Sequence, residues 1–173
     1  MKARILNLGL RRRYEQVVGA LRQDLYRYAL WLSRDPQAAE DIVQESLLRA
    51  WRGFDSLEDM DKAKPWLVTI VRREFLRFKE RQREETMDPV IVAEIAEEEA
   101  DPRVQELRTA IFGLEETYRE PLALQVLMGH STDEIAGIMG LNQGAVLTRL
   151  HRAREKLKQA FVEDGVTAQV EAG

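Results

Sequence analysis

The stretch from Ser131 to Lys158 constrains the fold most, because it has the pattern of two short helices joined by a tight turn. Ser131 and Glu134 are spaced as a capping box, which satisfies backbone N–H groups that the first helical turn leaves without partners. Gly140 can adopt the positive φ that ends a helix within one residue. Asn142 is then suited to cap a second helix. The pattern predicts a helix-turn-helix.

Both predicted helices are amphipathic. The apolar residues of the first are Ile135, Ile138 and Met139, beside the small Ala136, and those of the second are Val146, Leu150, Ala153 and Leu157. The other face of the second helix has Glu155 as its one acid and carries Thr148, Arg149, His151, Arg152, Arg154, Lys156 and Lys158. We interpret it as a recognition helix that enters a DNA groove. An ordinary helical hairpin with a solvated charged face is the alternative.

Composition restricts the fold class and excludes several chemistries. The chain has 173 residues, of which 45% are hydrophobic and five are proline, and few β-branched alternations occur, so we expect an all-α fold without a sheet. Cysteine is absent and the two histidines are isolated, which excludes disulfides and a cysteine- or histidine-rich metal site. No apolar run approaches the roughly 18 residues of a membrane span, and no signal peptide is evident. We therefore expect a cytoplasmic protein without membrane insertion, metal or cofactor.

The net charge of −4 hides an uneven distribution. Between residues 62 and 83 the acids Glu74 and Glu80 are outnumbered by the bases Lys62, Lys64, Arg72, Arg73, Arg77, Lys79, Arg81 and Arg83. Residues 84–101 contain eight acids and no base. The predicted organisation is two small helical domains, a flexible acidic linker and a disordered tail, with the bounds 10–83, 102–162, 84–101 and 163–173.

The first domain has the pattern of three helices. They are expected over Tyr14–Ser33, from the Asp35-Pro36 cap to Gly53, and over Trp66–Arg81, with a polar loop from Asp55 to Lys64. The outer side of the second helix forms one stripe of Asp41, Gln44, Glu45, Leu48 and Arg52. An exposed leucine between acids and an arginine indicates a protein partner, although a solvated face with one stray leucine is a common alternative.

The third helix combines bases with aromatic residues, a mixture suited to holding and stacking single-stranded bases. Basic amphipathic helices also bind membranes and acidic proteins, so this pattern alone leaves three kinds of partner open.

Three segments together resemble the extracytoplasmic-function (ECF) group of bacterial RNA polymerase sigma factors. They are AEDIVQESLLRAW at 39–51, PWLVTIVRREFLRFKERQR at 65–83 and GHSTDEIAGIMGLNQGAVLTRLHRAREKL at 129–157. The resemblance implies a region 2-like domain that binds the clamp of core RNA polymerase and melts and reads the −10 promoter element. It also implies a region 4-like domain that reads the −35 element and binds the polymerase flap.

The resemblance also assigns roles to residues of this chain. Core-polymerase binding falls to Asp41, Gln44, Glu45 and Leu48; −10 DNA binding to Lys62, Lys64, Arg72, Arg73, Arg77 and Lys79; and −35 DNA binding to Gln143, Thr148, Arg149, His151 and Arg152. The loop at 55–64 matches the segment that captures an unstacked −10 base, and the acidic linker matches the segment that runs toward the RNA exit path. An anti-sigma factor is the expected regulatory partner.

Two departures from the family pattern bear on promoter choice. Leu147 follows Ala145 and Val146 where many relatives have a base, and Arg73 stands where the family usually has asparagine. The promoter sequence therefore cannot be transferred from relatives. No catalytic residues are expected, because no phosphate-binding loop, dinucleotide motif or activated nucleophile is present. The alternatives are a sigma-like decoy that binds a regulator and a stand-alone helix-turn-helix regulator.

Overall fold

The computed structural model describes the backbone of residues 2–85 and 102–171, and the side chains of residues 8–83 and 102–161. Within these ranges it contains seven α-helices, two short 3₁₀ helices and no strand, which confirms the predicted all-α fold. The chain divides into two compact units, residues 1–93 and 94–173. Most of the predicted acidic linker, including its apolar run at 90–96, lies outside the described residues. None of the described helices combines the length and apolar character needed to cross a membrane.

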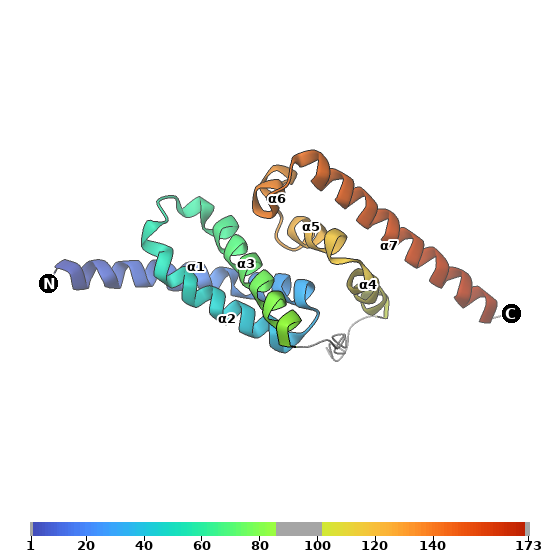
Figure 1. The fold of residues 1–173 in the computed structure, drawn as a ribbon, viewed down its shortest axis with the longest axis horizontal. Coiled ribbons are helices and arrows are strands. Elements are labelled where there is room, and N and C mark those ends of the chain that lie inside the picture. The colour runs from blue at the N-terminus through green and yellow to red at the C-terminus, as the bar shows by residue number, and fades with distance from the viewer. Residues whose placement is uncertain (1, 86–101, 172–173) are drawn as a thin grey trace. The chain divides into compact units, whose positions relative to one another are not determined.

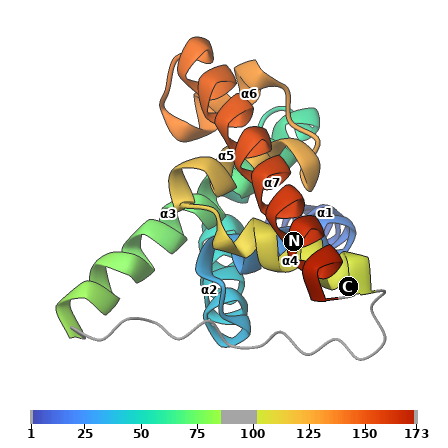
Figure 2. The ribbon, with the colours of Figure 1, turned by 90° about the vertical axis from the view of Figure 1, so that its right-hand side faces the viewer.

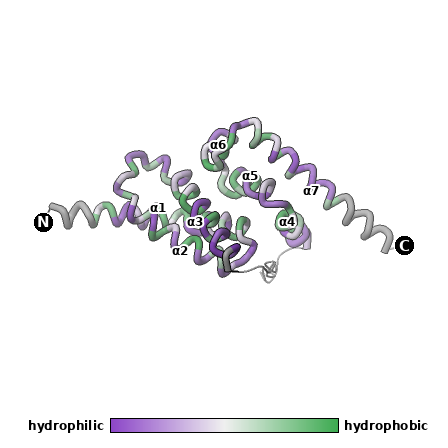
Figure 3. The backbone as a smooth tube through the Cα atoms, in the orientation of Figure 1, coloured by the Kyte–Doolittle hydropathy of each residue, from purple (hydrophilic) through white to green (hydrophobic). Residues whose placement is uncertain are grey.

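The first unit is a bundle of three helices that all contact one another. They are α1 (Lys2–Ser33), α2 (Pro36–Gly53) and α3 (Ala63–Glu85) (Figure 1). Its core is built from Leu25, Tyr28, Leu32, Ile42, Val43, Ala50, Leu67, Val68, Val71 and Phe75, all buried. Hydrophobic positions recur along these helices between hydrophilic stretches, as amphipathic packing requires (Figure 3). Each fully buried leucine, isoleucine or phenylalanine contributes about 1.5–3 kcal/mol.

Helix α1 is longer than predicted, because it begins at Lys2 rather than near Tyr14. Its first turns extend beyond the rest of the bundle (Figure 1). Extending an existing helix costs much less than starting one, so these turns do not need a buried apolar stripe of their own. The predicted start of α2 is confirmed: the Asp35 carboxylate accepts the N–H groups of Gln37 and Ala38, at 2.8 and 3.0 Å.

The predicted loop between α2 and α3 contains two single turns of 3₁₀ helix, Phe54–Ser56 and Met60–Lys62. Aromatic rings fix its base. The ring of Tyr14 lies edge-on to Trp51 and Phe54, at centroid distances of 5.2 and 5.1 Å, and Phe54 lies 6.3 Å from Trp66. The Tyr14 hydroxyl also donates a hydrogen bond to the carbonyl of Leu47. Burial raises the pKa of Tyr14, so this donor stays protonated.

The second unit consists of α4 (Pro102–Gly113), α5 (Glu116–Val126), α6 (Thr132–Met139) and α7 (Gln143–Glu171), and the first three pack against α7 (Figures 1 and 2). Its core is formed by Ile111, Phe112, Leu122, Leu124, Ile135, Ile138, Val146, Leu150 and Ala153. The backbone of α7 is helical to Glu171, where a disordered tail was predicted from Glu163. Helix propagation from the packed part of α7 explains this difference.

Two features of α4 and α5 differ from the pattern expected in the sequence. Val104, Leu107 and Val126 are apolar residues of these helices at positions where burial would be expected, but they are exposed. Arg119 is buried instead, and its guanidinium donates a hydrogen bond to the carbonyl of Leu114, just after the end of α4. A cation at this position stabilises the carbonyl groups that a helix C-terminus leaves without partners.

Candidate nucleic-acid and protein interfaces

The turn between α6 and α7 has the geometry predicted for a helix-turn-helix. The Ser131 hydroxyl accepts the N–H of Glu134 at 3.3 Å, and the Glu134 carboxylate accepts the N–H of Ser131 at 2.8 Å. This second bond, supported by nearby His130, lowers the pKa of the Glu134 carboxyl. Gly140 ends α6 in the left-handed conformation, with φ of 66°. The capping box and the glycine stop are therefore confirmed.

The beginning of α7 is tied to the beginning of α6. The side-chain oxygen of Asn142 accepts the N–H of Ala145 at 2.8 Å, which confirms the predicted cap. The Gln143 amide donates to the hydroxyl of Thr132 at 3.2 Å. Together with the buried side chains of Val146 and Leu150, these bonds fix how α7 is turned about its own axis within this unit.

The face of α7 opposite its buried stripe presents Thr148, His151 and Arg152, which are all exposed. They are three and four residues apart and therefore share one side of the helix. The Thr148 hydroxyl donates to the carbonyl of Gly144 at 2.9 Å. Arg149 lies beside this face and is half-buried. Four of the five residues predicted to contact the −35 element, including the exposed Gln143, are thus accessible from solvent, and Arg149 is partly so.

Two of the cations that the sequence places on the basic face of α7 form contacts within the protein. The Arg154 guanidinium donates to the side-chain oxygen of Gln125 on α5 at 2.5 Å. The Lys156 ammonium lies 3.4 Å from Glu115 and 5.4 Å from the ring centre of Tyr118. These two cations anchor α7 to α5. Counting charges along the sequence could not separate them from Arg152.

Leu147, in the second turn of α7, is an apolar residue whose side chain is 52% exposed. It stands four residues after Gln143 and four before His151, so the three side chains follow one another along the helix. The sequence identified this leucine as a departure from the family pattern, and the structure places it at the border of the exposed face.

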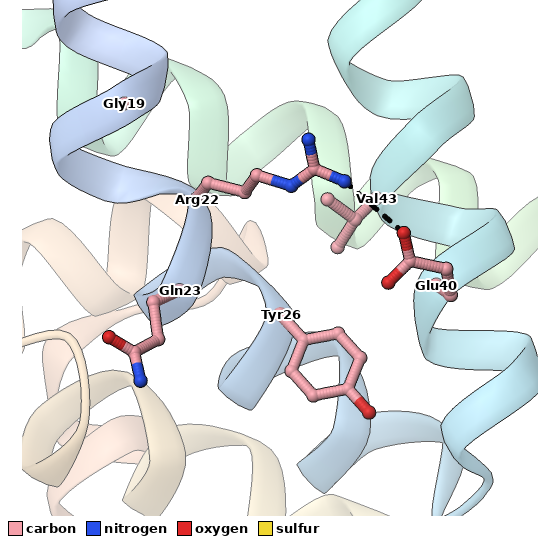
Figure 4. Close-up of a pocket in the computed structure, with 6 residues that line it drawn as sticks. All are labelled: Gly19, Arg22, Gln23, Tyr26, Glu40 and Val43. Atoms are coloured by element: carbon pink, nitrogen blue, oxygen red, sulfur yellow. Dashed lines mark hydrogen bonds and ion pairs between the residues drawn. The ribbon is translucent and has the colours of Figure 1, made fainter.

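The predicted stripe on α2 is largely accessible. Asp41, Gln44 and Leu48 are exposed, with Leu48 at 56%, whereas Glu45 is half-buried and pairs with Arg49 at 3.1 Å. Beside the stripe, α1 and α2 enclose a shallow groove, across which the Arg22 guanidinium meets Glu40 at 3.2 Å. Arg22, Gln23 and Tyr26 of α1 line it opposite Glu40 and Val43 of α2 (Figure 4).

The cations predicted to bind −10 DNA are spread over the exposed half of α3 rather than gathered on one line. Arg72 and Lys79 are seven residues apart and share a line, while Arg73 and Arg77, four residues apart, follow a different line. The Lys79 ammonium lies 5.6 Å from the ring centre of Phe75.

The two remaining predicted cations lie at the start of this region. Lys62, in the loop, pairs with Asp59 at 3.7 Å, and Lys64, in the first turn of α3, is half-buried. The six cations therefore cover a broad surface that includes the loop and one side of α3.

Glu74 is a residue whose importance the sequence reasoning missed. Its side chain is 2% exposed, and its carboxylate binds Arg49 of α2 and Arg77 of α3. The helical period places position 74 on the core-facing side, three residues after Val71 and four before Phe78. A carboxylate there predicts a buried ion pair, and this signal was available in the sequence.

The comparisons with known proteins agree with this geometry. A family model of Sigma-70 region 2 matches residues 17–85, and one of Sigma-70, region 4 matches residues 104–157. The ECF RNA polymerase sigma factor EcfG of Rhodopseudomonas palustris (strain TIE-1) is 34% identical over 146 residues, which cover 82% of this chain and 81% of that protein.

Two solved structures are similar in fold. The sigma factor RpoE of Bartonella quintana, in complex with the anti-sigma factor NepR, has a TM-score of 0.74 and 29% identity, covering 86% of this chain and 96% of that one. CnrH, in complex with the cytosolic domain of CnrY, has a TM-score of 0.65 and 25% identity, covering 89% and 90%.

A helical unit matching region 2 and a helix-turn-helix unit matching region 4 define a sigma factor of the sigma-70 type. The chain belongs to the ECF RNA polymerase sigma factors. It is an alternative sigma factor that binds core RNA polymerase and directs transcription initiation at promoters. The match over residues 17–85 accounts for the segment that a stand-alone helix-turn-helix regulator would leave unexplained.

Proposed function

We propose that this sigma factor binds its partners through three surfaces. The α2 stripe binds the clamp of core RNA polymerase, the loop at 55–62 with the basic side of α3 holds the −10 element, and the exposed face of α7 reads the −35 element. The corresponding domains are residues 10–83 and 102–162. The observation that carries the proposal is the orientation of α7, whose apolar stripe is buried and whose Thr148, His151 and Arg152 face solvent after a capped turn.

On α2, the chemistry of the stripe favours a protein partner with basic and apolar side chains. Leu48 exposes apolar surface about one helical turn from the Glu45 carboxylate and about two turns from the Asp41 carboxylate. Burial of such a leucine against a partner contributes favourable free energy, while the acids give the contact its charge complementarity.

On α3, the proposed role in −10 binding is supported by charge and by the anchoring of the neighbouring loop. Ring contacts of Phe54 with Tyr14 and Trp66 anchor the start of this loop to α1 and α3, and Met60 and Lys62 of the loop are exposed. Taking a base out of the stack costs a few kcal/mol, which stacking on the protein and cationic contacts must offset. Arg72, Arg73 and Lys79 would supply phosphate contacts.

On α7, arginine is the side chain best suited to read a base. Arg152 can donate two hydrogen bonds to a guanine edge in the major groove, while Thr148, His151 and Gln143 can contact neighbouring base edges or phosphates. Arg149, at the flank of the exposed face, is suited to a phosphate contact.

The factor makes no covalent bond itself, because it acts by binding and positioning, and it acts in the cytoplasm together with the polymerase. We further infer that an anti-sigma protein holds it inactive. The complexes of RpoE with NepR and of CnrH with the cytosolic domain of CnrY support this inference by analogy.

Run-off transcription with core RNA polymerase over a promoter library tests the proposal. Transcripts from a restricted set of promoters are expected, and no transcript from any promoter would contradict it.

Asp41→Arg should weaken polymerase binding in a pull-down by a few kcal/mol, because charge reversal at an interface places two cations opposite each other. Glu15→Arg is the matched control: it reverses an exposed acid on α1, outside the three surfaces. Equal loss in both variants would remove the α2 assignment.

A further inference from the structure

A buried carboxylate connects two of the proposed surfaces. Glu74 lies on α3 with its side chain 2% exposed, and its Oε1 forms an ion pair with the Arg49 Nε of α2 at 2.7 Å. The same oxygen accepts the Arg77 Nη1 from one turn further along α3. A buried carboxylate is costly unless cations compensate its charge. The Glu74 carboxylate therefore keeps both arginine side chains in place.

The connection continues to the α2 stripe. The other end of the Arg49 guanidinium, Nη2, lies 3.1 Å from Oε1 of Glu45. Charges therefore alternate in the order Glu45, Arg49, Glu74, Arg77, from the proposed polymerase-binding stripe to the proposed DNA-binding side of α3. We call these four residues the ionic row.

We propose that Glu74 is a positioning residue that holds Arg77 in the free sigma factor and releases it to a DNA phosphate when polymerase binds Glu45. The inference rests on the proposed function, because it assumes that the α2 stripe meets the polymerase and that α3 meets DNA.

The physical reason is competition for shared partners. Arg49 forms ion pairs with both Glu45 and Glu74. When a cationic group of the polymerase binds Glu45, Arg49 loses one partner and interacts more strongly with Glu74. The charge of the Glu74 carboxylate is then compensated more fully by Arg49, so its interaction with Arg77 weakens. The half-exposed Arg77 side chain becomes available to a phosphate. By thermodynamic linkage, DNA that binds Arg77 must favour polymerase binding at Glu45 to the same extent.

The alternative is that the ionic row only fastens α2 to α3. In that case its removal changes stability but leaves DNA binding by the free chain as it was. The salt dependence of binding separates the two possibilities, because it counts phosphate contacts and is insensitive to a small loss of stability in a chain that remains folded.

The experiment uses the full-length free chain and a short single-stranded oligonucleotide of mixed sequence. In Glu74→Gln, Arg77 loses its anionic partner, so the slope of log K against log salt should steepen by about 0.7 for one added phosphate contact. Adding Arg77→Gln should return the slope to that of the parent chain. Glu80→Gln, which removes one negative charge from the exposed side of the same helix, is the control for net charge and should change the slope less.

Glu45→Gln keeps the experiment decisive if Glu74→Gln unfolds the bundle, because it leaves the buried carboxylate intact. It should steepen the slope in the same direction but less. Circular dichroism checks that each variant remains helical. A slope that is unchanged in the folded Glu74 and Glu45 variants overturns the inference, as does a steeper slope that persists after Arg77→Gln.

A separate measurement distinguishes failure of the inference from failure of the proposed function. Arg73→Gln in the complex of polymerase, sigma factor and promoter should lower the salt slope by about one unit if α3 faces DNA. An unchanged slope there would remove the DNA-binding role of α3, and the inference with it. A lowered slope with no effect of Glu74→Gln on the free chain would overturn the coupling alone.

Discussion

Helices α3 and α7 are both basic in sequence, yet their cations are held in different ways. In α7, Arg154 and Lys156 make the contacts with α5 and its N-cap, while a different cation, Arg152, lies on the exposed face. In α3, Arg77 belongs to the exposed basic side and is at the same time bound to buried Glu74. Helix α7 therefore divides anchoring and proposed DNA contact between different side chains, whereas α3 assigns both to one arginine.

This difference determines what mutations can separate. In α7, stability, DNA affinity and base preference should respond to different substitutions. In α3, a change at Arg77 alters both the compensation of a buried charge and the proposed phosphate contact, so its effects on stability and on binding should appear together.

The largest effect is expected from the buried stripe of α7. Leu150→Ala should destabilise the second unit by about 3 kcal/mol, because it removes a fully buried side chain and leaves a cavity. Scanning calorimetry measures the loss. Leu147→Ala is the matched control in the same helix, since its side chain is 52% exposed and should cost within about 0.5 kcal/mol. Similar losses for both leucines would mean that Leu147 is buried by the rest of the chain.

The division of roles in α7 is sharpened by two arginines. Arg152→Ala should relax base preference at one or two −35 positions, where a bidentate arginine contact contributes about 1–3 kcal/mol of discrimination. Arg154→Ala should leave base preference unchanged and weaken only the contact with Gln125. Competition binding against a library of −35 sequences measures both. A uniform loss of affinity in Arg152→Ala would indicate a phosphate contact instead of base reading.

Leu147→Arg tests the border of the same face. An added cation there should tighten binding to all −35 sequences alike, since phosphate contacts carry no sequence information. The same library measures it, with Leu147→Gln as a control of similar polarity without charge. A changed order of preferred sequences would show that Leu147 faces base edges.

Much of the fold could be predicted from local patterns. The capping box at Ser131, the stop at Gly140 and the Asp35 cap depend on neighbouring residues, and each is confirmed with its expected partners. The stripes of Val146, Leu150 and Ala153 followed from the helical period alone. These features need no knowledge of which helix packs against which.

What could not be predicted depends on contacts between distant segments. The partner of Arg154 lies 29 residues away on α5, and that of Lys156 lies 41 residues away at the N-cap of α5. The sequence pattern of α7 could therefore not reveal that these cations face another helix. Arg49 and Glu74 lie on different helices of the first unit. Exposure of Val104 and Leu107 likewise depends on the packing of α4, which an apolar spacing does not determine.

A smaller effect is expected where α6 begins. Ser131→Ala should cost about 1 kcal/mol of stability in the second unit, because the N–H of Glu134 loses its acceptor. Ser131→Asp should restore most of it, since a carboxylate also accepts at this position. Calorimetry follows the same transition as for Leu150. Equal stability of the alanine and parent chains would show that water replaces the cap fully.

The smallest effect concerns Glu134, an exposed carboxylate that stabilises the second unit by hydrogen bonding, in contrast to the buried Glu74 of the first. Its pKa is lowered, first by the hydrogen bond from the Ser131 N–H, with a further contribution from His130. The folded unit therefore favours the ionised form. This contribution is fully present above the pKa of the unfolded chain and is lost as the pH falls through the lower pKa of the folded chain.

Because Glu134 is exposed, solvent screens the contribution, which should stay below about 1 kcal/mol. Glu134→Gln removes the titrating group and keeps a side-chain oxygen that can accept the Ser131 N–H. Its stability should fall less steeply than that of the parent chain over the acidic range in which Glu134 titrates, and the two curves should run parallel near neutral pH. Chemical denaturation at a series of pH values gives both curves, and their difference isolates Glu134 from the other acids. Parallel curves across the acidic range would mean that the cap holds equally well when Glu134 is protonated, and the stability of the helix-turn-helix would then depend on Ser131 and the buried stripe alone.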